Sequence, residues 1–397
     1  MNVAVPRGFR LAGVYCGIKR NPSKLDLSLI VSDRPATAAG VYTQNLVHAA
    51  SVTFNRQRTP SENMRVVVID SGNANACTGE RGLRDTHEMA RLAAEACGAA
   101  APEALVLSTG IIGAFLPMDK ITAGIALAAG ELGSDEDHLL KAAQGMLTTD
   151  TTHKIAGRKI AVGGQAVQIT GMAKGAAMIG PNMATMLCVL MTDARLDAAD
   201  AQEALREIVE VTFNCISVEG HMSTNDTVLL LANGAAGGSL LDGKDLAAFR
   251  AALGEVCTDL ARAIPSDGEG TTHLITLDVS GCKTVAAARE IAKTVANSVL
   301  VKTAIAGADP NWGRIVSAAG YSGIEFDPAG VDLDINGHVV YRSGAPVTFD
   351  ALQVSASIRD NRETHVLLRF REGESSVRFW TTDLTAEYIR LNADYHT

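Results

Sequence analysis

The apolar run Thr185-Met-Leu-Cys-Val-Leu-Met191 constrains the fold of this chain more than any other feature. Its length and composition are typical of a buried strand, and a loop rich in Gly, Pro and Asn precedes it. A residue at the start of a core strand is held rigidly. Thr185 occupies that position, so a reactive group there would have a fixed orientation.

The chemistry of Thr185 depends on whether the chain is cut before it. If the Ala184–Thr185 bond breaks, Thr185 gains a free α-amine beside its hydroxyl, so one residue carries both nucleophile and general base. Strain in the tight loop Gly180-Pro-Asn-Met-Ala184 would favour an N-to-O acyl shift. We therefore predict cleavage into segments 1–184 and 185–397. The alternative is an uncut chain in which Thr185 is an ordinary strand residue.

Charge and hydropathy exclude several classes of protein. The 397 residues include 35 Lys and Arg against 44 Asp and Glu, a net charge of −9, so the basic excess expected of a nucleic-acid binder is absent. Small, zwitterionic substrates fit this balance better. The N-terminus has no apolar signal region, and no run approaches the roughly 20 apolar residues of a membrane helix. We expect a soluble cytoplasmic protein without nucleic-acid or membrane partners.

Cysteine and histidine spacing argues against a metal centre. The seven cysteines include no Cys-x-x-Cys pair, and most lie in apolar surroundings, which favours reduced, structural residues. The nine histidines form no metal-ligand spacing. The glycine-rich stretch 233–238 lacks the Lys-Ser/Thr of a phosphate loop. We expect neither a metal nor a nucleotide cofactor.

Predicted strands and helices interleave along the chain in a mixed α/β pattern. The two segments 160–162 and 166–169 flank Gly163-Gly164, which is a hairpin signal. Strands are predicted at 27–31, 40–43, 66–70, 105–107, 160–162, 166–169, 185–191, 227–231 and 274–278, and helices at 82–97, 118–129, 135–146, 198–213, 243–263 and 286–295.

The segment from Lys174 to Leu187 resembles the cleavage-site signature of the ornithine acetyltransferase family, the bifunctional glutamate N-acetyltransferases of arginine biosynthesis. Seven further blocks resemble the same family, in order along nearly the whole chain, so chance similarity is a poor explanation. They are Ser71-Gly-Asn-Ala-Asn-Ala-Cys-Thr-Gly79, Ser108-Thr-Gly-Ile-Ile-Gly113, Thr148-Thr-Asp-Thr151, Met222-Ser-Thr-Asn-Asp-Thr227, Ser266-Asp-Gly-Glu-Gly270, Ala308-Asp-Pro-Asn-Trp-Gly-Arg-Ile315 and Asn392-Ala-Asp-Tyr-His-Thr397.

The resemblance implies a fold and an activity. The fold is an α/β arrangement of layered mixed sheets with helices, of the self-processing N-terminal-threonine acyltransferase type, related to the self-cleaving aminopeptidases. The activity moves acetyl from N2-acetylornithine to L-glutamate by a ping-pong route through acetyl-Thr185. Some members also use acetyl-CoA, which makes acetyl-CoA a candidate co-substrate. The alpha chain 1–184 and the beta chain 185–397 would form a heterotetramer of two of each.

Site residues follow from the chemistry and from the matching blocks. A glycine-rich turn after a strand lets backbone N–H groups approach a carbonyl oxygen that gains charge, which suits Thr109-Gly110. The resemblance assigns both residues to an oxyanion hole. It places Thr148, Lys174, Thr185, Glu269, Asn392 and Thr397 at the substrate. Lys174 would then form an ion pair with a substrate carboxylate, and Glu269 would form one with the ornithine ammonium.

The chain departs from the family pattern at three places: Ala176-Ala177, Gly180 and His221. These departures flank the cleavage loop and a neighbouring block, so they bear on processing rate and substrate preference. Two other functions use the same residues differently. An amidohydrolase or aminopeptidase would release the acyl group from the terminal threonine to water. An unprocessed small-ligand binding protein would leave Thr185 merely structural.

Overall fold

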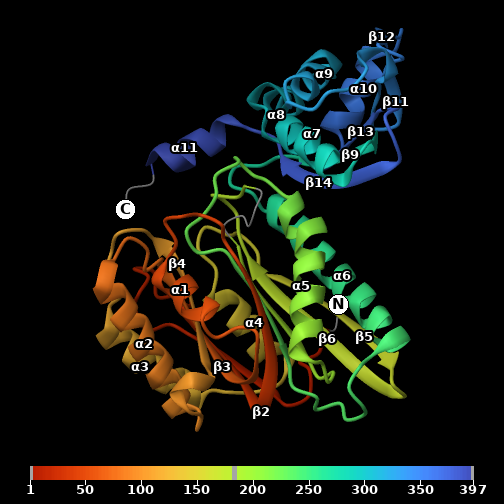
Figure 1. The fold of residues 1–397 in the computed structure, drawn as a ribbon. Helices are drawn as coiled ribbons and strands as arrows, with labels where there is room; N and C mark the ends of the chain where they lie inside the picture. The colour runs from red at the N-terminus through yellow and green to blue at the C-terminus, as the bar shows by residue number, and fades with distance from the viewer. Residues whose placement is uncertain (1–2, 181–185, 395–397) are drawn as a thin grey trace. The chain divides into compact units, whose positions relative to one another are not determined.

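The computed structural model describes residues 3–180 and 186–394, which form two compact units (Figure 1). Among these residues, unit 1 comprises 3–175, 186–212 and 222–260, and unit 2 comprises 176–180, 213–221 and 261–394. Neither unit is a continuous stretch of sequence. The expected division at 184/185 is a covalent one and stays a prediction.

Unit 1 is built on an eight-stranded mixed sheet with the order β4-β3-β2-β8-β7-β6-β5, and β1 pairs with β2. The pairs β3–β4 and β7–β8 are parallel, whereas β2–β3, β2–β8, β5–β6 and β6–β7 are antiparallel. The strands are β1 (Phe9–Val14), β2 (Leu27–Tyr42), β3 (Ser61–Asn73), β4 (Ala104–Ile111), β5 (Lys154–Val162), β6 (Gln165–Lys174), β7 (Leu187–Thr192) and β8 (Thr227–Ala232).

Helices cover both faces of this sheet. On one face, Leu139 of α4 and Met146, directly after this helix, pack with Val189 and Leu229. On the other, α2 and α3, which lie together in Figure 1, pack with alternate residues of β2 and β3. The helices of this unit are α1 (Ala50–Arg56), α2 (Gly79–Ala96), α3 (Met118–Gly130), α4 (Glu136–Gly145) and α5 (Ala198–Val211), and α6 (Gly243–Ser266) continues into unit 2. The layered α/β class is therefore confirmed.

Most predicted elements of this unit exist, with one correction. The Gly163-Gly164 hairpin is confirmed: both glycines have positive φ (58° and 72°), as a two-residue turn requires. The segments 27–31 and 40–43 are not two strands, because β2 runs unbroken from Leu27 to Tyr42. Register shifts between Val31 and Ala38 bend that strand while it stays paired with β3. The predicted strand 185–191 is observed from Leu187, and Thr185 lies outside the described residues.

Unit 2 contains a six-stranded mixed sheet with the order β12-β11-β10-β13-β9-β14, in which β9 and β13 are parallel. Strand β13 alternates between buried and half-buried residues, which shows that one face lies on the core. The strands are β9 (Leu274–Cys282), β10 (Asp332–Ile335), β11 (His338–Arg342), β12 (Ala345–Pro346), β13 (Glu363–Arg369) and β14 (Ser375–Thr382).

The core of unit 2 lies between this sheet and its helices. Ile291 of α7, Ile315 of α9 and Ile358 of α10 pack with Leu277 and Leu368 of the sheet. The helices are α7 (Val285–Asn297), α8 (Val299–Ala306), α9 (Trp312–Gly320), α10 (Ala351–Arg359) and α11 (Ala386–Asp394). The sequence predicted only β9 and α7 among these elements.

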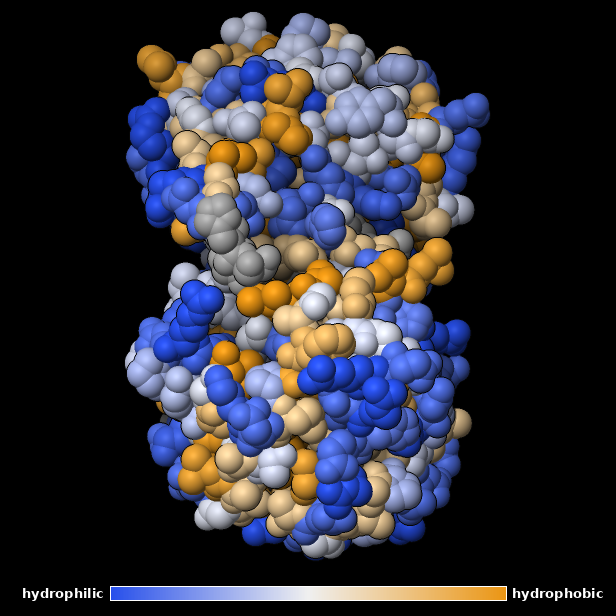
Figure 2. Space-filling view, turned by 90° about the vertical axis from the view of Figure 1, so that its left-hand side faces the viewer, coloured by the Kyte–Doolittle hydropathy of each residue, from blue (hydrophilic) through white to orange (hydrophobic). Residues whose placement is uncertain are grey.

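Hydrophobic and hydrophilic residues are interspersed on the face shown in Figure 2. The most exposed large apolar side chains, Leu46 and Leu352, belong to different units. Single exposed apolar residues are ordinary on protein surfaces. Within the described ranges, no helix is both long and apolar enough to span a membrane.

Candidate active site

The predicted oxyanion-hole residues, Thr109 and Gly110, lie near the end of β4. Gly110 pairs with Gly72 of the parallel neighbour β3, and its φ of 140° disfavours any other residue. A β-carbon on Gly110 would lie 2.2 Å from the carbonyl carbon of Gly72. Thr109 is buried, whereas Gly110 is exposed. The backbone at Gly110 is thus both rigid and accessible, as a donor to a developing oxyanion must be.

Lys174 contacts β4, which carries Thr109, and also pairs with β7, the strand that follows Thr185. It is the last residue of β6 and is buried, with an exposed fraction of 2%. Its Nζ donates to the Oγ1 of Thr109 over 3.4 Å. In the sheet register it pairs with Leu187, two residues after Thr185. The structure therefore brings two predicted site residues together beside the start of β7.

Thr148 reaches the same group through Asp150. The backbone N–H of Thr148 donates to Oδ2 of Asp150 over 3.1 Å, and the N–H of Gly175 donates to Oδ1 over 2.6 Å. Lys154 Nζ forms an ion pair with Oδ1 at 2.8 Å, and both side chains are essentially inaccessible. Thr109, Thr148 and Lys174 thus share one polar cluster.

Asp150 and Lys154 are the members of this cluster that the sequence analysis did not identify. The only signal for Asp150 was its place inside the block 148–151. Burial disfavours the charged form of Asp150, but Lys174, Lys154 and the Gly175 N–H outweigh burial and lower the pKa of this carboxyl below its usual range. Asp150 is therefore a carboxylate at neutral pH. It neutralises part of the cationic charge that two buried lysines bring beside Thr109.

Glu269 and Asn392 form a second group, within unit 2. Asn392 Nδ2 donates to Oε2 of Glu269 over 2.9 Å and to the carbonyl oxygen of Tyr388 over 3.1 Å. The N–H of Glu269 donates to the carbonyl of Ala176 over 3.0 Å. The structure thus brings together two further predicted residues, from the loop before β9 and from α11. Burial, and then the charges of Glu219 and Glu269, raise the pKa of nearby Tyr388 to about 12.

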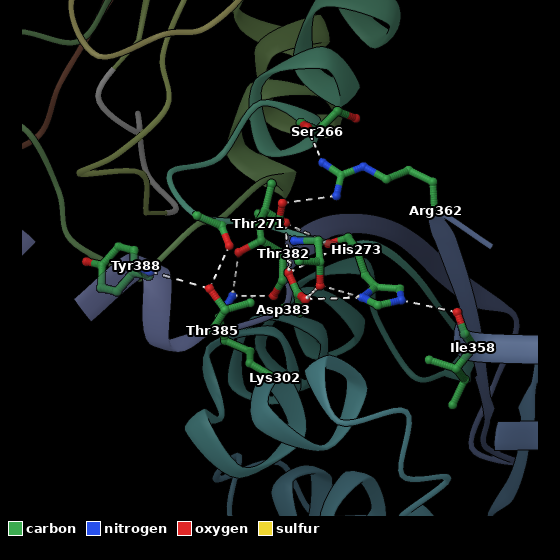
Figure 3. A network of polar contacts seen from close by, with 12 residues as sticks. Ser266, Thr271, His273, Lys302, Ile358, Arg362, Thr382, Asp383, Thr385 and Tyr388 are labelled. Atoms are coloured by element: carbon green, nitrogen blue, oxygen red, sulfur yellow. Dashed lines mark hydrogen bonds and ion pairs between the residues drawn. The ribbon is translucent and has the colours of Figure 1, made fainter. Parts of the chain in front are cut away.

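A polar network holds this loop and the start of α11 in place (Figure 3). Asp383 accepts from Thr271 Oγ1 over 2.8 Å and from the N–H groups of Thr272 and His273 over 2.9 and 3.1 Å. The Oγ1 of Thr385 donates to the carbonyl of Gly270 over 2.6 Å. Because these bonds join the residues directly after Glu269 to the residues directly before α11, they restrain both the loop of Glu269 and the helix of Asn392.

Close backbone approach accounts for Gly180, one of the departures from the family pattern. A β-carbon at Gly180 would lie 2.5 Å from the carbonyl carbon of Gly220, so only glycine fits without a shift. The carbonyl of Ile179 accepts from the N–H groups of Val218 and Gly220 over 2.9 and 3.0 Å. The three remaining predicted site residues, Ala184, Thr185 and Thr397, lie outside the described residues.

The seven cysteines, all within the described ranges, form no disulfide, and Cys188, Cys215, Cys257 and Cys282 are buried. Across residues 3–180 and 186–394, no group of three or more His, Cys, Asp and Glu side chains could hold a metal ion.

Comparison with known proteins gives consistent matches. The family model described as the ArgJ family matches residues 10–397. The arginine biosynthesis bifunctional protein ArgJ of Symbiobacterium thermophilum is 47% identical, over 100% of this chain and 98% of its own. That of Rhodopirellula baltica is 45% identical, over 99% and 96%. A solved ArgJ chain from Bacillus halodurans is 40% identical with a TM-score of 0.50, over 51% of this chain and 96% of its own.

We predict that Asp150→Asn destabilises the protein by about 3–5 kcal/mol at pH 7, because it leaves buried lysines without their carboxylate. The folded-state pKa of Asp150 is depressed, so its contribution is complete above the unfolded pKa of about 3.9 and is lost as the pH falls towards the folded value. In the Thr185→Ala background, where one uncut chain unfolds, the difference in urea unfolding free energy with and without Asp150→Asn should therefore narrow in acid. Asp259→Asn, which breaks an exposed pair with Arg158, is the control and should change stability far less. Equal losses in the two variants would contradict this account.

Proposed function

Because the chain belongs to the ArgJ family and is therefore an acetyltransferase of arginine biosynthesis, we propose that it transfers acetyl from N2-acetylornithine to L-glutamate through an acetyl ester on Thr185. The observation that carries this route is the contact between Lys174 and Thr109 beside the start of β7. A hydroxyl oxygen that accepts from Lys174 keeps its own proton to donate. Thr109 and Gly110 can then both donate to one oxyanion.

The proposed reaction has two halves. The Thr185 hydroxyl attacks the acetyl carbonyl of acetylornithine while the Thr185 α-amine takes the hydroxyl proton. Thr109 and Gly110 stabilise the oxyanion, the C–N bond breaks, and the ornithine amine leaves with that proton. The glutamate amine then attacks the acetyl ester, and Thr185 recovers its hydroxyl proton as acetylglutamate leaves.

The remaining residues recognise the ends of the substrates. We propose Lys174 as the cation for a substrate carboxylate, with Thr148 beside it. We propose Glu269 as the anion for the ornithine ammonium, with Asn392 and Thr397. The bond from Asn392 to Glu269 supports this role, because it fixes the orientation of one carboxylate oxygen.

The sheet of unit 1 supports two chains that stay together after a cut before Thr185. Strands β1 to β6 would belong to the alpha chain, whereas β7 and β8 would belong to the beta chain. In the sheet, β7 pairs with β6 and β8 pairs with β2, so the two beta-chain strands lie between alpha-chain strands. The matched Bacillus halodurans chain, about half as long as this one, also agrees with separate chains.

Four finer assignments belong to the same proposal. The relatives are named bifunctional, which supports acetyl-CoA as a second acetyl donor. We propose that no metal or other cofactor takes part, that two alpha and two beta chains assemble as a heterotetramer, and that the enzyme works in the cytoplasm.

Incubation of the purified protein with acetylornithine, with and without glutamate, tests the reaction. Without glutamate, each enzyme should release only one equivalent of ornithine. Further release should require glutamate, because the acetyl group must leave Thr185 before the next turnover. Continuous release without glutamate would instead identify an amidohydrolase. Replacing acetylornithine with acetyl-CoA in the same assay tests the second donor by the formation of acetylglutamate.

Processing gives a direct prediction about Thr185. Intact mass of the wild type should show fragments 1–184 and 185–397. Thr185→Ser should still cleave because a hydroxyl remains, whereas Thr185→Ala should stay whole and inactive. An active wild type with only the 41.5 kDa chain would refute the proposal.

Glu269→Gln should raise the KM for acetylornithine by about 10- to 100-fold, the loss of one charge-assisted hydrogen bond, and leave cleavage complete. The amide keeps an acceptor for Asn392, so the loop keeps its partner. Glu387→Gln is the matched control, since Glu387 is an exposed carboxylate on α11 paired with Arg390. If both variants have the wild-type KM, Glu269 does not recognise the ammonium.

A further inference from the structure

The segment 223–226, inside the block 222–227, directly precedes β8 and is buried. Thr43 holds it by two bonds: its Oγ1 donates to the carbonyl of Ser223 over 2.8 Å, and its N–H donates to the carbonyl of Asp226 over 2.9 Å. The Oγ of Ser223 accepts from the N–H of Asn225 over 3.0 Å. The side chains of Asn225 and Asp226 therefore project from a fixed backbone.

The side chain of Asn225 binds the strand of the oxyanion hole. Its Nδ2 donates to the carbonyl of Ser108 and to the carbonyl of Ala74, each over 2.7 Å. Ser108 directly precedes Thr109 in β4, and Ala74 directly follows β3. One amide group thus fixes the ends of the two parallel strands that carry Gly110 and its neighbour Gly72.

The side chain of Asp226 binds the strand of the nucleophile. Its Oδ1 accepts from the N–H of Met186 over 3.1 Å, and Met186 is covalently bonded to Thr185. The N–H of Thr227 also donates to the carbonyl of Met186, over 3.1 Å. Both polar atoms of the Met186 backbone are therefore held by the segment at the start of β8.

We propose that Asn225 and Asp226 are positioning residues that set the distance between the oxyanion hole and the Thr185 nucleophile. Two adjacent side chains bind the two catalytic strands, one by donating and the other by accepting. This inference rests on the proposed function, because it takes Thr185, Thr109 and Gly110 as the reacting groups. A misplacement of about 1 Å between such groups costs roughly 100-fold in rate.

The burial of Asp226 affects the protonation state of its carboxyl. Burial raises the pKa of Asp226 well above its usual range, against the opposing effect of the Met186 N–H, and so favours the neutral form of this carboxyl. An asparagine has the shape of a neutral aspartic acid and the same carbonyl acceptor. An aspartate in place of Asn225 has the same shape but cannot donate to two carbonyls at once.

Two isosteric exchanges therefore have opposite expected results. Asn225→Asp should lower kcat about 100-fold with KM within about twofold of wild type. Asp226→Asn should keep self-cleavage and kcat within a few-fold, whereas Asp226→Ala should slow both about 10- to 100-fold. Intact mass gives the cleaved fraction, and single-turnover acetylation of that fraction gives the rate apart from processing.

Matched controls separate positioning from stability. Asn55→Asp removes a buried asparagine whose Nδ2 donates to the carbonyl of Val106 in the middle of β4. Asp193→Ala removes a buried carboxylate directly after the far end of β7, whose Oδ1 accepts from the backbone N–H of Gln168 in β6. Both controls should lose stability in urea yet keep kcat. If Asn225→Asp does not fold, Asn225→Ala is compared with Asn55→Ala in the same way.

The outcomes are distinct. Positioning is overturned if Asn225→Asp and Asp226→Ala lose no more kcat than their controls, or if Asp226→Asn is as impaired as Asp226→Ala. Thr185→Ala serves as the reference for the reaction itself: if that variant turns over substrate, the proposed function fails, whatever the other variants do. If it is inert while Asn225→Asp is fully active, only the positioning role fails.

Discussion

The two central strands of unit 1, β7 and β8, position the predicted site residues that lie at the edge where these strands begin. All residues of β7 and β8 are buried, so both faces of the sheet must be covered. Because the two strands are parallel, they begin at the same edge, where Leu187 pairs with Thr227. The antiparallel β6 ends at that edge with Lys174. Lys174 and the Asn225–Asp226 pair therefore lie at the edge where β7 begins.

Charge is handled differently in the two groups of predicted site residues. In unit 1, Lys154, Lys174 and Asp150 are buried, so their charges interact strongly and each needs a partner. In unit 2, Asn392 is exposed and the orientation of the Glu269 loop is secured by the Asp383 network behind it. The side chains of the unit 1 group are thus oriented by burial and ion pairing, and those of the unit 2 group by supporting hydrogen bonds.

Local sequence patterns predicted local structure well. The Gly163-Gly164 turn was identified because two positive φ values are a short-range demand that glycine meets. The long strand β2 was divided in two, because its charged middle, Asp33 and Arg34, is exposed where the strand shifts register. Strands β10 to β14 were missed: β10, β11 and β12 are only two to five residues long, and β13 and β14 pair with β9, far along the chain.

The same distinction applies to the candidate site. Thr109, Lys174 and Glu269 were predicted from residue type and from matching blocks. The predicted site residues that the structure describes lie in two groups, one in each unit. Asp150, Asn225 and Asp226 lay inside those blocks without an assigned role. Their function depends on which backbone atoms they reach, Gly175 in one case and Met186 and Ser108 in the others. Contacts between residues 117 positions apart, such as Asn225 with Ser108, leave no periodic trace in a sequence.

Self-cleavage, together with the interleaved strands, would change the molecularity of folding. Before the cut, β7 and β8 reach their places between β2 and β6 as parts of one chain, so folding is a unimolecular process independent of concentration. After the cut, the same sheet would have to form from two polypeptides, and its recovery from the unfolded state would depend on their encounter. The alpha chain alone would have unpaired edges at both β2 and β6, which favour aggregation. Cleavage would thus make refolding slow, and the active form would persist because it unfolds slowly, which is kinetic stability.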